Sequence, residues 1–196
     1  MNTAQPIRGT EDLKRIKEYY RTSVPNTRNQ LLVIMGLNTA LRISDILSLT
    51  WEKVYDFRQE KYCSHILLVE QKTGKSTKIY LNKTIIDTLD CYMHERKKKG
   101  KVVKPNQFLF CHSNKNVPIS RVQAFRIIKA AAEACKLQGV ICCHSLRKTF
   151  GYHAWQQGVS PALLMNIYNH SSYQVTRRYL GIEQDDRDRI FMQIKL

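Results

Sequence analysis

The chain has 196 residues, of which 43% are hydrophobic, and its 32 basic and 16 acidic side chains give a formal charge of +16. This length and apolar content fit one folded domain and exclude an intrinsically disordered chain. The charge predicts a polyanionic partner, with nucleic acid as the leading class, because lysine and arginine neutralise phosphates and release their counterions.

The first half of the chain predicts three helices and a hairpin. Residues 1–9 are expected to be a loose lead-in, and Thr10 is the expected N-cap of a helix over "EDLKRIKEYYR", which has acids in its first turn. Residues 26–41 are apolar enough for a buried helix. "RISDILSLTWEKV" predicts a short helix and a turn, after which "HILLVE" and "STKIYL" form a hairpin around the Thr73-Gly74 turn.

The second half is predicted to be almost entirely helical. Residues 82–100 form an amphipathic helix with a basic end and a terminal glycine, and residues 105–118 form a loop with a brief extended piece. Further helices are expected at roughly 120–136, 144–157, 161–167, 172–180 and from about 183. The fold class is therefore α+β, mostly helical with a small antiparallel sheet or hairpin.

Membrane and metal chemistry are not indicated by the sequence. No apolar run is long enough to span a bilayer and the N-terminus does not resemble a signal peptide, so we expect a cytoplasmic protein. The six cysteines are scattered and form no CxxC pair, which favours reduced thiols over a zinc site.

Two basic residues of the first half stand in unusual surroundings. Arg42 lies between Leu41 and Ile43, and a guanidinium held against a core is costly unless it is paired or serves a ligand. Asp45, three residues later, is placed to orient it, so a structural salt bridge and a ligand site are equal alternatives. Lys72 lies at the hairpin turn, where a lysine is ordinarily only solvated.

The second half contributes histidines, arginines and a tyrosine. In "CHSLRKTFGYHAW", His144 and Arg147 are three residues apart, so on a helix they share one face. Leu146, Phe150 and Trp155 are expected to pack inward, and His144 and Arg147 to look away from the core. In "NHSSYQVTRRYLG", His170 precedes Tyr179 by nine positions, and two arginines stand directly before the tyrosine. Such a segment is either a helix end with a basic edge or a nucleophile that faces a phosphorylated ligand.

These four pieces, in this order, resemble the catalytic domain of the tyrosine recombinase (phage integrase) family, and the resemblance runs from about residue 10 to the end of the chain. "TALRISDIL" is similar to the TGLRxSE box, which implies that Arg42 is the first catalytic arginine. "EQKTGKSTKIYL" is similar to the family's β-hairpin, whose catalytic lysine falls best on Lys72, with Lys75 as the alternative.

The remaining boxes carry over in the same way. "HSLRKTF" resembles HxLRHTF and implies catalytic roles for His144 and Arg147, while "NHSSYQVTRRYL" resembles LGHSS…T…RYL and gives His170 and the nucleophile Tyr179. The chain departs from these boxes at Ala40, Asp45, Lys148 and the Tyr168-Asn169 pair, where the family usually has Gly, Glu, a second histidine and Leu-Gly. Asparagine tolerates the left-handed conformation, so we expect Asn169 to make the turn.

The resemblance implies a DNA strand transferase. Tyr179 would attack a DNA phosphodiester and form a 3′-phosphotyrosyl intermediate, two arginines would hold the phosphate, and a hairpin lysine would protonate the leaving 5′-oxygen. This chemistry needs neither a metal nor another cofactor. Double-stranded DNA and a homotetramer assembled on it are the implied partners, and the implied source is a bacterium or a phage.

Three points stay open in the sequence. Most family members carry a separate DNA-clamping domain before the catalytic domain, and this sequence (residues 10–196 after the lead-in) lacks it, as a truncated chain or a short family member would. The tail after residue 183 either docks on a neighbouring protomer or packs on its own domain. Two alternatives to a recombinase are a type IB topoisomerase-like enzyme and a non-catalytic DNA-binding regulator with the same fold.

Overall fold

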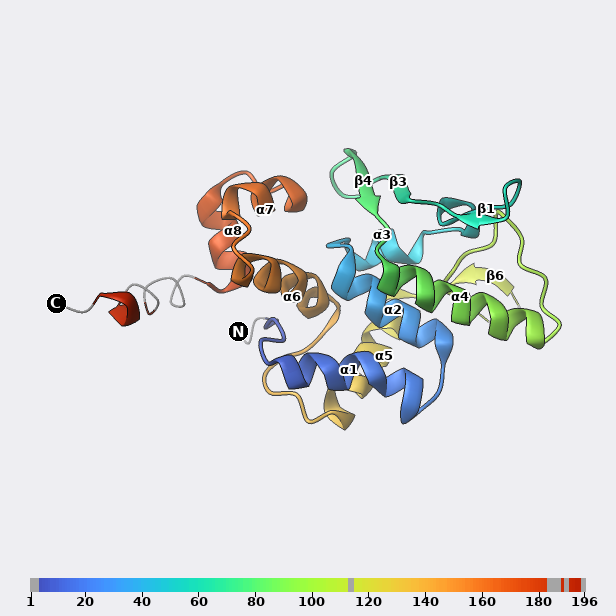
Figure 1. The fold of residues 1–196 in the computed structure, drawn as a ribbon, viewed down its shortest axis with the longest axis horizontal. Coiled ribbons are helices and arrows are strands. Elements are labelled where there is room, and N and C mark those ends of the chain that lie inside the picture. The colour runs from blue at the N-terminus through green and yellow to red at the C-terminus, as the bar shows by residue number, and fades with distance from the viewer. Residues whose placement is uncertain (1–3, 113–114, 183–187, 189–190, 195–196) are drawn as a thin grey trace.

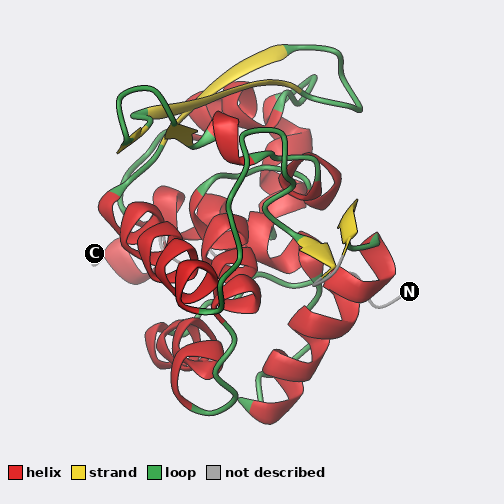
Figure 2. Ribbon diagram, turned by 90° about the vertical axis from the view of Figure 1, so that its right-hand side faces the viewer, coloured by secondary structure: helices red, strands yellow, loops and turns green. Residues whose placement is uncertain are grey.

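The computed structural model describes residues 4–112, 115–182, 188 and 191–194, which form a mostly helical domain with three small hairpins (Figures 1 and 2). In chain order the elements are α1 (Thr10–Thr22), α2 (Thr27–Asn38), α3 (Ile43–Leu47), a 3-10 turn (Trp51–Lys53), β1 (Tyr55–Asp56), β2 (Lys61–Tyr62), β3 (His65–Val69), β4 (Ser76–Tyr80), α4 (Lys83–Lys98), β5 (Cys111–His112), β6 (Lys115–Pro118), α5 (Arg121–Ala134), α6 (Cys143–Gln156), α7 (Pro161–Tyr168) and α8 (Tyr173–Leu180). The expected α+β class is confirmed.

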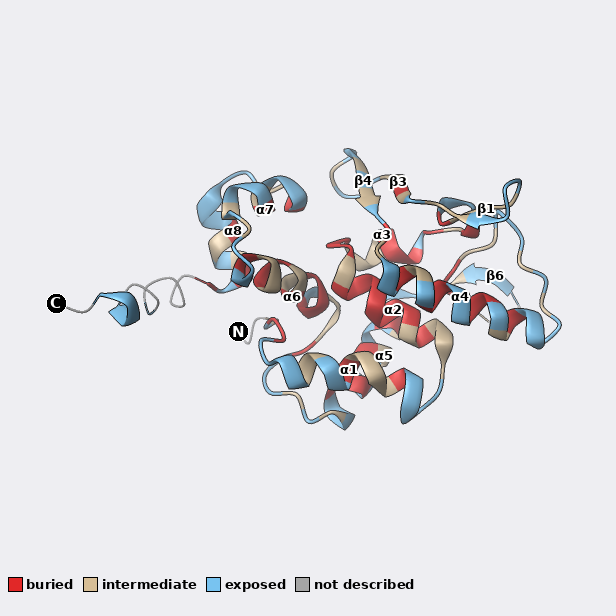
Figure 3. Ribbon diagram, in the orientation of Figure 1, coloured by how far each residue is buried: buried red, intermediate tan, exposed pale blue. Residues whose placement is uncertain are grey.

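Helix α2 is the central element of the core. Every residue from Leu31 to Leu37 is buried, and the helix packs against α1, α4 and α6 (Figure 3). A helix that is apolar on all sides is stable only inside a domain. Its N-terminus is capped by Asn26, whose side chain accepts a hydrogen bond from the backbone N–H of Asn29 at 3.0 Å.

The hairpin of β3 and β4 is the longest of the three two-stranded sheets. Its antiparallel register pairs His65 with Tyr80 and Val69 with Ser76. Gly74 adopts a positive φ of 66° in the turn, a conformation that glycine reaches without steric cost. This confirms the predicted Thr73-Gly74 turn, and the hairpin extends above the helices on the side of α7 (Figure 1).

The last three described helices form a separate packing unit at one end of the molecule (Figure 1). Residues of α6, α7 and α8, among them Trp155, Leu164 and Leu180, share a buried cluster with Ala40. Gly151 is the point of closest approach, because a Cβ there would lie 2.4 Å from the Tyr168 hydroxyl. The absence of a side chain at Gly151 therefore lets Tyr168 and Leu180 rest directly on α6.

The lead-in is the clearest difference from expectation. Residues 4–9 run along α6 rather than hanging loose, and Ile7 is buried. The Ile7 backbone N–H donates to Thr149 Oγ1 at 2.8 Å, and Arg8 donates to the Gly181 carbonyl at 2.8 Å. Hydrophobic burial and long-range hydrogen bonds, which local sequence patterns do not reveal, hold this segment in place.

Smaller differences from the sequence prediction concern the start of α1, the β1–β2 pair and the end of the chain. Helix α1 already includes Thr10, and its N-cap is Gly9 without a side-chain hydrogen bond, so the predicted cap is wrong by one residue. The β1–β2 pair between residues 55 and 62 was not predicted, because each strand has only two residues. The helix expected from about residue 183 lies largely outside the described residues. Within the described part of the chain, no helix is long and apolar enough to cross a membrane.

Candidate active site

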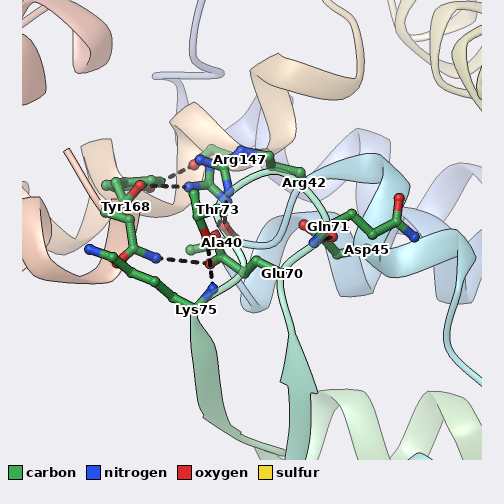
Figure 4. Close-up of polar contacts among 10 residues, drawn as sticks. Ala40, Arg42, Asp45, Glu70, Gln71, Thr73, Lys75, Arg147 and Tyr168 are labelled. Atoms are coloured by element: carbon green, nitrogen blue, oxygen red, sulfur yellow. Dashed lines mark hydrogen bonds and ion pairs between the residues drawn. The ribbon is translucent and has the colours of Figure 1, made fainter.

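Four segments that are distant in sequence meet between α6, α8 and the β3–β4 hairpin. They are the corner between α2 and α3 with Arg42, the hairpin turn with Lys72, the first half of α6 with His144 and Arg147, and the segment from Asn169 to Tyr179. Figure 1 shows the helices and the hairpin that carry them, and Figure 4 shows Arg42 and Arg147. The His170 and Tyr179 rings are 5.0 Å apart. The charges of the two arginines act on the pKa values of both histidines and the tyrosine, as described below, so these five groups share one site.

Arg42 is held at the N-cap of α3 by a carboxylate that the sequence did not single out. Its Nη1 lies 2.5 Å from Glu70 Oε2, and the two side chains are 17% and 3% exposed. The predicted partner, Asp45, instead accepts a hydrogen bond from the backbone N–H of Gln71 at 3.0 Å. The expectation that Asp45 orients Arg42 is therefore wrong, because Glu70 reaches it from the end of β3 (Figure 4).

Arg147 is almost fully buried, with 3% of its surface exposed. Its Nη1 donates to the Ala40 carbonyl and its Nη2 to the Tyr168 carbonyl at 3.3 Å. The guanidinium also lies 4.7 Å from the centre of the Tyr168 ring, a favourable cation–π arrangement. The expectation that Arg147 looks away from the core is wrong: its guanidinium is buried between α6, the Ala40 corner and the end of α7, where main-chain carbonyls take the place of water.

Ala40 owes its role to its backbone. It adopts a φ of 55°, the left-handed region that glycine, the usual family residue, reaches freely. This conformation turns the chain sharply between α2 and α3, and the Ala40 carbonyl meets the Arg147 guanidinium. The corner thereby connects the segments that carry the two arginines.

The two histidines differ in their surroundings. His170 stacks on the Tyr168 ring at 5.4 Å between ring centres and meets Tyr179 edge-on at 5.0 Å, whereas His144 lies near the start of α6 and is exposed. Loss of hydration lowers the pKa of both imidazoles, even though His144 keeps part of its surface exposed, and the charges of the neighbouring arginines lower it further. Both rings are therefore biased toward the neutral form, which can accept a proton at neutral pH.

Tyr179 lies in the last turn of α8, close to the arginines. Burial raises the pKa of its hydroxyl, while the charges of Arg147 and Arg42 oppose that rise. The buried hydroxyl oxygen has no hydrogen-bond partner of good geometry among the described residues, although the Arg147 guanidinium is near enough to influence it. An unsatisfied buried hydroxyl is costly, and a ligand that offers it a partner would relieve that cost.

The arginines before the tyrosine have different surroundings. Arg178 is exposed, and the guanidinium of Arg177 lies 5.6 Å from the centre of the Tyr173 ring. Both lie at the C-terminal end of α8, where positive charge complements the helix dipole.

The hairpin turn places its lysines differently. Lys72 and Lys75 are both exposed, as expected for turn residues. The charge of Lys72 is among the influences that lower the pKa of His144. Lys72 therefore lies near enough to the first turn of α6 to act on that ring.

Asn169 and Lys148 mark two departures from the family boxes. Asn169 has φ 54° and ψ 43° at the end of α7, which confirms the expected left-handed turn. Lys148 has a position that the sequence did not predict: its Nζ lies 5.1 Å from the centre of the Tyr179 ring and donates to the Ala4 carbonyl at 2.8 Å. It thus connects the lead-in to the tyrosine.

Sequence reasoning missed Glu70, Tyr168 and Lys148 as members of this site. Glu70 ends an apolar strand, which is an unusual place for a buried acid, and this was the available signal. Tyr168 and Lys148 were visible only as departures from family boxes. Among the described residues, no group of three His, Cys, Asp or Glu side chains is placed to hold a metal ion.

Two arginines, two histidines and a tyrosine lie together in a mostly helical α+β domain, and comparisons with known proteins identify its family. Residues 9–185 match the model of the phage integrase family. The chain belongs to that family.

Individual relatives extend this result. The probable integrase/recombinase YoeC of Bacillus subtilis (strain 168) is 42% identical over 185 residues, which are 94% of this chain and 93% of YoeC. Tyrosine recombinase XerA of Pyrococcus horikoshii is 24% identical over 157 residues, which cover 80% of this chain and 51% of XerA. The chain thus spans nearly all of one relative and about half of the other.

Solved structures show the same fold. A crystal structure of XerA recombinase superposes with a TM-score of 0.76 at 20% identity, covering 98% of this chain and 66% of that one. XerH site-specific recombinase bound to palindromic difH substrate, a post-cleavage complex, gives a TM-score of 0.70 at 21% identity and covers 91% of this chain and 50% of that one. The predicted recombinase catalytic-domain fold is confirmed.

Proposed function

We propose that this protein is a site-specific DNA recombinase that cuts and rejoins double-stranded DNA through a covalent bond to Tyr179. The observation that carries the proposal is the buried Tyr179 hydroxyl, which lacks a hydrogen-bond partner of good geometry among the described residues and lies within the field of Arg147 and Arg42. A phosphodiester in this place would give the arginines their anion and the hydroxyl its electrophile.

The reaction is a transesterification. Tyr179 Oη attacks the phosphorus in line, a bond from phosphorus to the tyrosine oxygen forms, and the bond to the 5′-oxygen breaks. Arg42 and Arg147 bind the non-bridging oxygens and stabilise the charge that grows on them in the transition state. Lys72 gives its proton to the leaving 5′-oxygen. The phosphotyrosyl bond preserves the phosphodiester energy, so a 5′-hydroxyl can reverse the reaction and reseal the strand.

His170 is the best-placed acceptor for the tyrosine proton. Its Nδ1 lies 3.1 Å from Thr176 Oγ1, and that hydroxyl donates in turn to the Ser172 carbonyl at 3.4 Å. Thr176 can accept a hydrogen bond from an Nδ1–H while its own hydroxyl donates to Ser172, and in that tautomer Nε2 carries the lone pair. The neutral ring can therefore take up a proton through Nε2, while His144 donates to a phosphate oxygen.

Double-stranded DNA as the partner agrees with the charge of the chain and with the complexes that its relatives form. The formal charge of +16 favours binding to DNA, and the XerH relative is bound to its difH substrate. A lambda integrase fragment is recorded as a dimer on a core site, with a TM-score of 0.62. We propose that this chain also acts as a homo-oligomer on DNA, with a tetramer as the expected recombination complex.

The deciding experiment detects the covalent intermediate. Protein is incubated with supercoiled plasmid in EDTA and quenched with SDS, and the DNA is examined for attached protein. Tyr179→Phe is expected to abolish the adduct, whereas Tyr173→Phe, which removes an exposed hydroxyl from the same helix, retains it. An adduct that survives in Tyr179→Phe overturns the assignment.

Two other outcomes separate the alternatives. Plasmid relaxation without exchange between paired sites would identify a type IB topoisomerase-like enzyme. DNA binding without any adduct, in a chain joined to a clamp domain, would identify a non-catalytic regulator. The complete set of arginines, histidines, lysine and tyrosine supports the recombinase, because a binding protein has no use for a nucleophile and its acid.

A further inference from the structure

Glu70 is a buried carboxylate among the cations of the site. Only 2% of its surface is exposed, yet it sits at the tip of β3 beside Arg42 (Figure 4). Its Oε2 accepts from Arg42 Nη1 at 2.5 Å and from Thr73 Oγ1 at 2.9 Å, and its Oε1 accepts from Asn169 Nδ2 at 3.2 Å. Every carboxylate oxygen is therefore engaged.

The three partners lie on three different segments of the site. Arg42 stands at the corner between α2 and α3, Thr73 directly follows Lys72 in the hairpin turn, and Asn169 directly precedes His170. The contacts span 28 residues to Arg42 and 99 residues to Asn169. One carboxylate thus connects the backbone neighbourhoods of three proposed catalytic groups.

The electrostatic state of Glu70 supports this role. Burial by itself raises the pKa of the carboxyl, but the hydrogen bonds from Thr73 and Arg42 and the charges of Arg42 and Arg147 bring the pKa below its usual value. The carboxylate therefore stays ionised at neutral pH and offsets part of the repulsion between the two arginines.

Glu70 engages only part of the Arg42 guanidinium. Only its Nη1 is hydrogen-bonded to Glu70, and its Nη2 and Nε make no hydrogen bond with any described residue. A guanidinium has five N–H donors in a rigid fork. Glu70 therefore fixes the orientation of the fork from one side and leaves donors for a phosphate on the other.

We propose that Glu70 is a positioning residue that assembles Arg42, the Lys72 hairpin and the His170 turn around the phosphate site before DNA arrives. This inference rests on the proposed recombinase function. Glu70 touches no reacting atom and acts through the groups that it holds. The competing interpretation is that Glu70 blocks Arg42 until a phosphate displaces it, and the two interpretations predict opposite effects of removing the charge.

The test compares Glu70→Gln with Glu95→Gln. Glu95 is a matched control on α4, because its carboxylate also accepts from a threonine, Thr27, at 2.6 Å and pairs with Lys99 outside the site. For each variant, the rate of adduct formation is measured across plasmid concentrations, which yields the saturating rate and the half-saturating concentration.

A positioning role predicts a loss of rate without a loss of binding. In Glu70→Gln the saturating rate should fall on the order of 100-fold, since small misplacements of catalytic groups are this costly. The half-saturating plasmid concentration should stay the same or fall, because a negative charge has left the phosphate site. Glu95→Gln should match wild type in both. An unchanged saturating rate overturns the proposal, and a raised rate establishes the blocking role instead.

A second readout does not depend on catalysis. Hydrogen–deuterium exchange is followed in the full chain at the hairpin turn, residues 70–76, and at residues 169–172. Glu70→Gln should speed exchange in both segments and Glu95→Gln in neither, and unchanged exchange in Glu70→Gln overturns the proposal. If wild-type protein forms no adduct, the proposed function fails, and the exchange data still decide whether Glu70 positions these segments.

Discussion

The side chains of Arg147 and Tyr168 each donate a hydrogen bond to the backbone carbonyl of the other residue. The Arg147 guanidinium lies over the Tyr168 ring and donates to the Tyr168 carbonyl, while the Tyr168 hydroxyl donates to the Arg147 carbonyl at 2.8 Å. Tyr168 is fully buried. This mutual contact connects α6 to the end of α7, so that the second arginine and the turn before His170 are positioned together.

Removing the Tyr168 hydroxyl should affect stability more than catalysis. Tyr168→Phe loses one buried hydrogen bond, which we expect to lower the free energy of unfolding by about 1 kcal/mol, while the ring that supports Arg147 remains. Tyr168→Leu also loses the ring face and should slow adduct formation in addition. Urea unfolding and the adduct rate test both variants, and a Phe variant as slow as the Leu variant would show that the hydroxyl itself serves catalysis.

Substitutions of Lys72 and Lys75 should have different effects on the cleavage rate, because only Lys72 is expected to be the general acid. Lys72→Ala should slow cleavage by about 100-fold or more, because a 5′-alkoxide is a poor leaving group without a proton, whereas Lys75→Ala should have little effect. A substrate whose bridging 5′-oxygen is replaced by sulfur needs no acid and should restore the rate of Lys72→Ala. Rescue of Lys75→Ala instead would move the assignment to Lys75.

Stability should fall as the pH drops through the histidine range. The pKa values of His144 and His170 lie below the ordinary 6.5 in the folded protein, chiefly through burial and then through neighbouring positive charge. The unfolded chain therefore binds more protons at and below this pH, so acidification favours unfolding.

Thermal unfolding between about pH 7.5 and pH 5.5 measures this effect, since the window brackets the unperturbed histidine pKa. The melting temperature of wild type should decrease across the window, and the decrease should be smaller in the double variant His144→Gln and His170→Gln. Equal pH slopes in the two proteins would show that these rings are not responsible.

The lead-in should be part of the stable fold. Thr149 Oγ1 accepts from the Ile7 N–H and donates to the Ser145 carbonyl at 2.7 Å. Thr149→Val leaves a buried N–H unpaired and should lower the free energy of unfolding by about 1–3 kcal/mol.

The matched control is Thr22→Val, which removes an exposed hydroxyl bonded only to the Glu18 carbonyl at 3.1 Å. It should change stability by less than about 0.5 kcal/mol. Equal urea midpoints for Thr149→Val and wild type would mean that the Ile7 contact does not contribute in solution.

Local patterns were sufficient for most of the elements and for much of the candidate site. The helix expected at 144–157 is observed at Cys143–Gln156, and that expected at 172–180 at Tyr173–Leu180. These segments have apolar spacing and caps that act within a few residues. The order of the four boxes likewise indicated Arg42, Lys72, His144, Arg147, His170 and Tyr179, whose catalytic roles stay predictions.

The sequence by itself determined the family, the helical and hairpin elements and the residue types that a phosphate site needs, because these depend on short-range spacing and chemistry. Only the tertiary structure decided that Glu70 rather than Asp45 pairs with Arg42, that Arg147 is buried, and that the lead-in reaches Gly181. Each of these depends on contacts between residues 21 to 173 positions apart. Packing and the cost of leaving a buried charge or donor unpaired determine such partners, and a local sequence pattern predicts neither.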